Sequence, residues 1–68
     1  MKRFKTNQQV IADITASDST MKAVKGNVVT VENGFVTIQT TEVMSRWGNE
    51  FKSHSMSINA KLDNVEAV

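Results

Sequence analysis

The side chains best suited to binding chemistry are concentrated between residues 46 and 54 of this 68-residue chain. This stretch combines positive charge, aromatic rings and an imidazole, carried by Arg46, Trp47, Phe51, Lys52 and His54. Tryptophan and arginine are among the commonest hot spots of protein–protein interfaces. We therefore expect these five residues to form a partner-binding surface, with Trp47 at its centre. The alternative is that Trp47 folds over the open end of a small barrel and only completes its packing.

Positive charge in the N-terminal third offers a second kind of chemistry, contact with nucleic-acid phosphates. The formal charge of the chain is only +1, but residues 1–25 hold five Lys and Arg against two Asp, whereas residues 26–68 hold three against five Asp and Glu. The five N-terminal cations are Lys2, Arg3, Lys5, Lys22 and Lys25. Polynucleotide binders use cations for phosphates and flat side chains for stacking, a role for Trp47 and Phe51. The alternative is a solvated basic terminus that aids solubility.

Catalytic, metal and cofactor sites are not expected. A hydrolytic triad needs a nucleophile, a histidine and an acid held together. The predicted strand pairing instead places the single histidine, His54, opposite Glu42, while Ser53 and Ser55 face the other way. The chain has no cysteine and three isolated glycines, so neither thiolate metal ligands nor a phosphate-binding glycine loop is available. We therefore expect a protein that is not an enzyme and needs no cofactor.

The elements that position these groups include a β-hairpin over residues 28–39. Two β-branched runs flank Asn33-Gly34, which tolerates the positive φ angles of a type I′ turn and so sets the register. The predicted pairs are Val31 with Val36, Thr30 with Thr37, and Val29 with Ile38. The four branched apolar side chains then share one face, which is expected to be buried. A bulge at Gly26-Asn27 would let Val24 share that facing.

The N-terminal segment allows two structures. Thr6 and Gln9 have the spacing of a capping box, and apolar residues follow at helical spacing, which predicts a short helix over residues 7–16. Val10, Ala12 and Ile14 also alternate, however, which is typical of a strand. Residues 17–20, with the sequence Ser-Asp-Ser-Thr, are expected to form a turn in either case.

A second hairpin is expected from Phe35 to about Met44 and from Phe51 to about Asn59, with a three-residue turn at residues 47–49. This loop length is preferred because it pairs apolar with apolar and acid with base. The predicted pairs are Ile38 with Ile58, Thr40 with Met56, Glu42 with His54, and Arg46 with Glu50. Residues 62–65 then turn into a final short strand that could return beside the first.

These elements predict a single, mainly β domain over residues 1–68. It would be an antiparallel meander of three to five strands, curled into an SH3-like barrel or a bent sheet, with one short N-terminal helix. The order of helix, bent strands, tight turns and a terminal Leu62-Asp63-Asn64-Val65 resembles the layout of small SH3-like barrels. These include Sm-like RNA binders and the KOW modules of transcription and translation proteins. The Asp-Gly and Asn-Leu signatures of an Sm core have no match in register, so no site residue is carried over.

The function expected from these observations is that of a small, non-enzymatic binding or regulatory module. It would dock an edge strand and the Trp47 hairpin onto another protein or onto its own copies. The alternative is a nucleic-acid-binding SH3-like barrel that uses the basic N-terminal third with Trp47 and Phe51. The chain has neither the apolar stretch of a secretory signal nor a segment long enough to span a membrane, so a cytoplasmic protein is expected. Its short length also fits a protein encoded by a phage or another mobile element.

Overall fold

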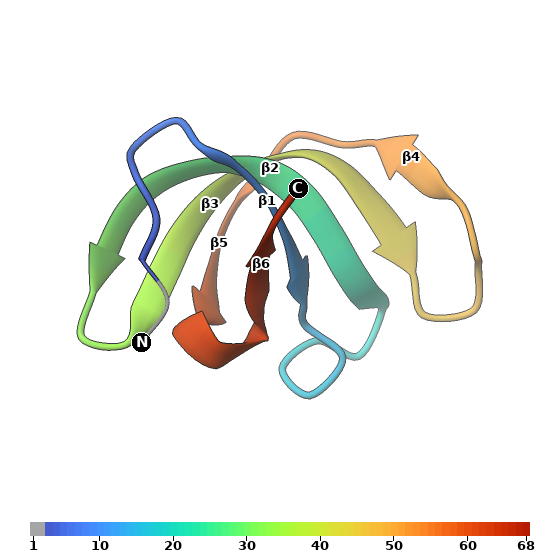
Figure 1. Ribbon diagram of the computed structural model, residues 1–68. Coiled ribbons are helices and arrows are strands. Elements are labelled where there is room, and N and C mark those ends of the chain that lie inside the picture. The colour runs from blue at the N-terminus through green and yellow to red at the C-terminus, as the bar shows by residue number, and fades with distance from the viewer. Residues whose placement is uncertain (1–2) are drawn as a thin grey trace.

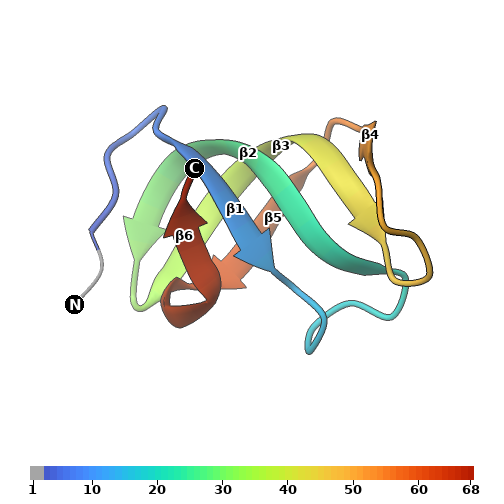
Figure 2. The ribbon, with the colours of Figure 1, turned by 45° about the vertical axis from the view of Figure 1, so that its right-hand side comes forward.

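Six antiparallel strands form one strongly curled sheet in the computed structural model, which describes residues 3–68 (Figure 1). The elements are β1 (Gln9–Asp13), β2 (Met21–Glu32), β3 (Phe35–Ser45), β4 (Phe51–Ser53), β5 (Ser57–Lys61), a 3-10 turn η1 (Leu62–Asn64) and β6 (Val65–Ala67). The strand order is β4-β3-β2-β1-β6, and β5 pairs with β3 beside β4. Figure 2 shows β1 and β6 on one side of the curl and β5 on the other. The prediction of three to five strands is therefore too low, and within residues 3–68 the sheet is not closed.

The segment predicted as a helix over residues 7–16 contains strand β1 instead, so the helix prediction is wrong. Asn7 has a φ of 69°, which interrupts a right-handed helix at its first turn. Gln9, the second residue of the predicted capping box, is the first residue of β1, and the Gln8 side chain accepts a hydrogen bond from the Lys5 backbone N–H at 2.9 Å. β1 pairs with β2 on one side and β6 on the other, and its alternating residues Val10 and Ala12 are buried. Tertiary pairing therefore decides between the two periodicities in favour of the strand.

The Asn33-Gly34 turn connects β2 to β3 as predicted, with φ angles of 52° and 81°. The pairs Val31–Val36 and Thr30–Thr37 are confirmed, but Val28, not Val29, lies opposite Ile38. Val29 is the extra residue of a bulge between these pairs. Val36 and Ile38 are buried, whereas Val29 and Val31 are 44% and 39% exposed, so only half of the predicted apolar face is buried.

A second register shift lies at Gly26, where a bulge was predicted. Lys25 lies opposite Glu42 and Gly26 opposite Thr40, so the extra residue is Thr41 on β3 rather than a residue of β2. Gly26 is buried, and a Cβ atom added to it would lie 2.2 Å from the Gln39 carbonyl oxygen. The glycine therefore permits the close approach of two backbones beside the bulge in β3.

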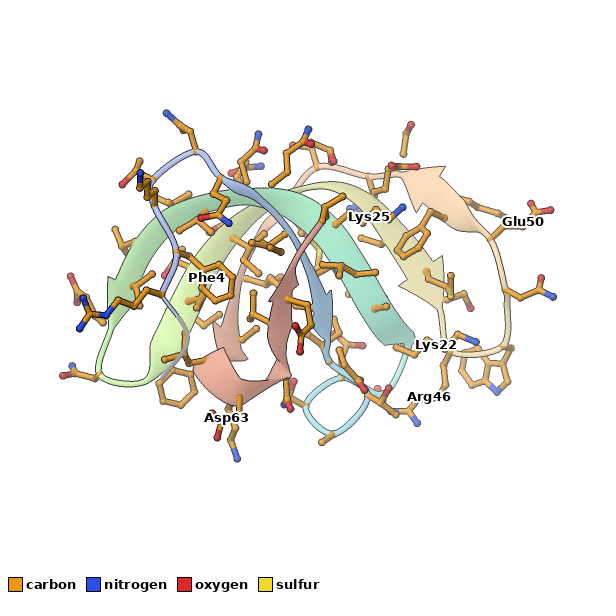
Figure 3. All side chains as sticks on the ribbon, viewed as in Figure 1. Phe4, Lys22, Lys25, Arg46, Glu50 and Asp63 are labelled. Atoms are coloured by element: carbon orange, nitrogen blue, oxygen red, sulfur yellow. The ribbon has the colours of Figure 1, made fainter. Side chains whose placement is uncertain are left out.

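The core inside the curl consists mainly of small branched side chains. Its buried residues are Val10, Ala12, Ile14, Val24, Val28, Val36, Ile38, Ala60 and Val65. Phe4 packs against this cluster from the N-terminal segment (Figure 3). That segment is held against β2 by two backbone hydrogen bonds, from Asn7 N–H to the Val28 carbonyl at 2.7 Å and from Val28 N–H to the Gln8 carbonyl at 3.0 Å.

The second hairpin keeps its predicted register only in part. Ile38 lies opposite Ile58 as predicted, and the Thr40 backbone N–H donates to the Met56 carbonyl at 2.8 Å. Glu42 lies opposite Ser53 rather than His54, so the pairing slips by one residue and the predicted long strand is divided into β5 and β4. The chain then passes through η1, and β6 returns beside β1, the strand nearest the N-terminus.

Candidate functional site

Trp47 lies in the loop that joins β3 to β4, and its side chain is 79% exposed. Ser45 closes the turn beneath it: the Ser45 hydroxyl accepts from the Trp47 backbone N–H at 3.3 Å, and the Ser45 carbonyl accepts from Gly48 N–H at 3.1 Å. The indole does not belong to the core or to the residues packed against it. The alternative of a packed cap over the core is therefore wrong, and Trp47 is a surface residue.

The Arg46 side chain anchors this loop to the β1–β2 loop. Its guanidinium donates to three backbone carbonyls, those of Thr15, Asp18 and Ser19, the last at 3.2 Å (Figure 3). The Arg46 backbone N–H donates to the Thr20 carbonyl at 3.0 Å. The planar fork of arginine can satisfy several acceptors at once. The predicted pairing of Arg46 with Glu50 is thus replaced by contacts across the molecule, and Arg46 positions Trp47.

The β1–β2 loop that receives Arg46 is itself ordered by Asp18. Its Oδ1 atom accepts from the Thr20 backbone N–H at 2.7 Å, the Thr20 hydroxyl at 2.8 Å and the Met21 N–H at 2.9 Å. These bonds, above all that from the Thr20 backbone, lower the pKa of the Asp18 carboxyl below its ordinary value, and the charge of Arg46 lowers it further. The turn predicted at residues 17–20 is present, and its carboxylate organises the surface on which Arg46 rests.

Replacing Arg46 with lysine should loosen the loop that carries Trp47. A single ammonium cannot reproduce the fork that binds three carbonyls, so we expect a loss of about 1–2 kcal/mol in the free energy of unfolding, after allowance for partial exposure. Amide exchange in residues 15–20 and 46–49 should accelerate. Denaturant unfolding and hydrogen exchange measure these effects, with Lys52→Ala, an exposed cation of the same hairpin, as the control. Equal behaviour of the two variants would contradict the anchoring role.

Asp18→Asn should destabilise the protein near neutral pH but not in acid. The asparagine keeps the acceptor oxygen and loses the charge. Because the folded pKa of Asp18 is lowered, its carboxylate contributes stability that is fully present above the unfolded value of about 3.9 and is lost as the pH falls through the folded pKa. Unfolding curves of the two proteins at a series of pH values should therefore converge in acid. A constant difference at every pH would refute this assignment.

Phe51 and Lys25 come from different predicted sites but meet on the outer face of the sheet. The Lys25 ammonium lies 4.3 Å from the centre of the Phe51 ring, within the range of a cation–π contact (Figure 3). Lys25 is on β2 and Phe51 on β4, and β3 lies between them. The structure therefore joins one residue of the predicted basic set to the predicted hairpin site.

The other predicted site residues are more dispersed. Lys52 and His54 are exposed, and Lys52 lines a hollow of about 310 Å³ beside Trp47. The His54 backbone bonds to Thr40 and Thr41, and its side chain does not face Glu42 through the strand register as predicted.

The N-terminal cations do not form one surface with the hairpin. Arg3 and Lys5 are exposed on the N-terminal segment. This segment runs beside the C-terminal half of β2 (Figure 1). Lys22 is half-buried near the β1–β2 loop, where its carbonyl accepts from Ile14 N–H. Lys2 lies outside the described residues. The basic N-terminal third is thus divided between two ends of the sheet.

Comparison with known proteins finds no matching family model, no matching curated protein and no matching solved structure. The structure also contains, over residues 3–68, no helix with the length and apolar character needed to cross a membrane. Over the same residues, no three His, Cys, Asp or Glu side chains are grouped so that they could hold a metal ion. The site is therefore interpreted from its own geometry.

Sequence reasoning missed the contribution of the β1–β2 loop to this site. Thr15, Asp18 and Ser19 contribute through backbone carbonyls. Every residue has a backbone carbonyl, so the residue type does not predict this contact. The only available signal was the Ser-Asp-Ser-Thr cluster of residues 17–20, typical of a turn with side-chain acceptors. That signal predicts a turn but not its contact with Arg46, because the contact spans 27–31 residues of sequence.

Proposed function

We propose that this protein is a small binding module that inserts Trp47 into a partner protein. The observation that carries the proposal is the 79% exposure of this indole on a loop whose base is held by Arg46. A large side chain presented in one position loses little further conformational freedom on binding, which favours affinity. Exposure of so large an apolar group has a cost in water that a binding role explains.

The surroundings of Trp47 suit a polypeptide partner. The hollow beside the indole is lined by Gly48, Asn49 and Lys52, among others, and could accept a side chain of the partner. β4 is the terminal strand on this side of the sheet, so its outer edge could pair with an extended segment. Hydrogen bonds along β4 would then supply affinity while Trp47 supplies specificity.

The arrangement of strands supports an SH3-like fold as the scaffold of this module. β1 lies between β2 and β6, the strands follow a meander from β1 to β4, β5 also pairs with β3, and a 3-10 turn precedes the last strand. This is a resemblance of layout, and it adds nothing to the choice of partner. The proposal therefore depends on Trp47 and its loop.

Trp47→Ala should strongly weaken binding of peptides selected from a random library by the native protein. We expect a loss of about 30-fold or more in affinity, as for a central hot-spot residue. Trp47 is the only tryptophan, so its fluorescence reports titrations of the native protein, and isothermal titration calorimetry measures the native and variant proteins alike. The matched control is Val68→Ala, which removes another exposed apolar side chain. Selected peptides that bind the Trp47→Ala protein as tightly as the native one would disprove the proposal.

Nucleic-acid binding is the second candidate, and the contact of Lys25 with Phe51 favours it. This pair places a cation and an aromatic ring together on the outer face, as single-strand binders require. Glu42 lies opposite Lys25 in the sheet and reduces the positive potential there. Titration with single-stranded DNA and RNA at low salt should quench Trp47 only if this candidate is correct, and the affinity should then fall steeply with salt.

A further inference from the structure

A second exposed surface, around the aromatic ring of Phe35, lies at the opposite end of β3 from Trp47. Val29, Val31 and Phe35 surround the β2–β3 turn with exposures of 44%, 39% and 47%. β3 begins at Phe35 and ends two residues before Trp47, so the two surfaces are separated by the length of that strand (Figure 1). Val31 lies opposite the buried Val36 and so points to the inner face of the sheet, whereas Phe35 lies opposite Glu32 on the outer face. Phe35 is therefore an exposed aromatic side chain of the outer face at this end of the sheet.

Phe35 is flanked by opposite charges on the same face of the sheet. Glu32 on β2 and Lys61 on β5 are its register partners on the two sides. Cross-strand partners point to the same face, and adjacent strands lie about 4.8 Å apart, so the acid and the base stand on either side of the ring. The next row, Thr37 with Asn59, is neutral and internally bonded at 2.7 Å. A shallow hollow of about 290 Å³ adjoins Phe35 and Lys61.

We infer that this face binds a second copy of the same chain through a two-fold axis. A row of acid, aromatic ring and base is complementary to itself when one copy is rotated by half a turn about an axis parallel to β3 at Phe35. The two Phe35 rings then meet at the centre, and Glu32 of each copy faces Lys61 of the other. An axis across the strands would instead oppose like charges, so the charges select one orientation.

The dimer interface would cover a large share of the surface of this small molecule. A standard interface buries about 800 Å² on each partner, roughly a sixth of the 4596 Å² surface of the chain. Exposed ion pairs contribute little to affinity, so the paired Phe35 rings supply the attraction and the charges supply the register. Both Trp47 loops remain outside the interface, so the dimer would present two Trp47 loops for binding. This inference does not depend on the proposed function of Trp47.

Sedimentation equilibrium from micromolar to millimolar protein tests the dimer with reciprocal charge changes. Because each change occurs twice in a two-fold dimer, Glu32→Lys and Lys61→Glu should each raise the dimer Kd about tenfold or more, and Phe35→Ser should give monomer. The double variant Glu32→Lys/Lys61→Glu should restore native dimerisation. Glu50→Lys, at the other end of the molecule, and Trp47→Ala should have no effect. Native spectra would show that each variant is folded.

Several results would overturn the inference. A native protein that remains monomeric at millimolar concentration has no such dimer. Single charge reversals without effect, or a double variant that stays monomeric, would exclude reciprocal Glu32–Lys61 contacts. Loss of the dimer in Trp47→Ala would show that copies associate through the Trp47 loop instead. Peptide binding at Trp47 can succeed or fail independently of all these outcomes.

Discussion

Gly26→Ala is expected to remove most of the stability of the fold. The added Cβ would lie 2.2 Å from the Gln39 carbonyl oxygen and 2.7 Å from the Thr40 Cα. Both obstacles are backbone atoms of β3, which cannot move without breaking the pairing of β2 with β3. Overpacking of a well-packed site costs about 1–3 kcal/mol when side chains can adjust, and here they cannot. We expect a loss of about 3 kcal/mol or more, a large part of the stability of a small domain.

Gly48→Ala is the matched control for this substitution. A Cβ at Gly48 would come no closer than 3.6 Å to its nearest neighbour, the Ser45 side chain. Denaturant unfolding followed by circular dichroism should therefore show a near-native transition for Gly48→Ala and an unfolded or barely folded protein for Gly26→Ala. Equal stability of the two variants would mean that β2 and β3 do not approach at Gly26.

Thr40→Val should cost about 2–4 kcal/mol although it preserves shape. Thr40 is 1% exposed, and its hydroxyl donates to the His54 carbonyl at 2.9 Å and accepts from the Met56 N–H at 3.0 Å. Valine leaves both backbone groups without this partner, and each unsatisfied buried group costs about 1–3 kcal/mol. Because these bonds join β3 to the chain between β4 and β5, amide protection of Met56 should fall as well.

Thr40→Ser distinguishes the contribution of the Thr40 hydroxyl to stability from that of its methyl group. Serine keeps both hydrogen bonds and loses one buried methyl, worth about 1 kcal/mol. The expected order of stability is native, then serine, then valine, as measured by urea unfolding. A valine variant at least as stable as the serine variant would show that the hydroxyl is unimportant to the fold.

The parts of the fold that could be predicted from sequence are those set by local backbone chemistry. Asn33-Gly34 specifies its turn by its tolerance of positive φ, and the adjacent pairs Val31–Val36 and Thr30–Thr37 follow from it. The prediction fails at the next residue, Val29, where β2 bulges. Nothing local marks that bulge, because it arises from the bending of the long hairpin around the core.

The N-terminal strand illustrates the opposite case. Val10, Ala12 and Ile14 fit a strand, but the neighbouring residues also fit a short helix, and local propensity does not separate them. β1 is stabilised by pairing with both β2 and β6, and β6 lies more than 50 residues later in the sequence. Strand pairings of this kind are set by tertiary context, which outweighs propensity. The six-stranded count has the same origin, since β6 and β4 have only three residues each.

The residue types of the candidate site could be identified from the sequence, but the contacts that hold the site together could not. Trp47 was identified by residue type and turn position; its side chain is exposed, and its role in binding stays a prediction. Arg46 was assigned to a partner by residue type, yet its guanidinium is bound to the β1–β2 loop. The contact of Lys25 with Phe51 was also missed, because it crosses β3 between two segments treated as separate sites. Each miss involves a contact between elements that only the folded sheet brings together.

The emission spectrum of Trp47 in the free protein tests the central claim most directly. An indole presented to solvent on an anchored loop should emit at the long wavelength of tryptophan in water, be quenched freely by a neutral quencher, and keep this spectrum on dilution. Since the chain has one tryptophan, the signal has no other source. A blue-shifted emission that resists quenching and persists on dilution would show that the indole is packed within its own chain. The proposed docking role of Trp47 would then be wrong.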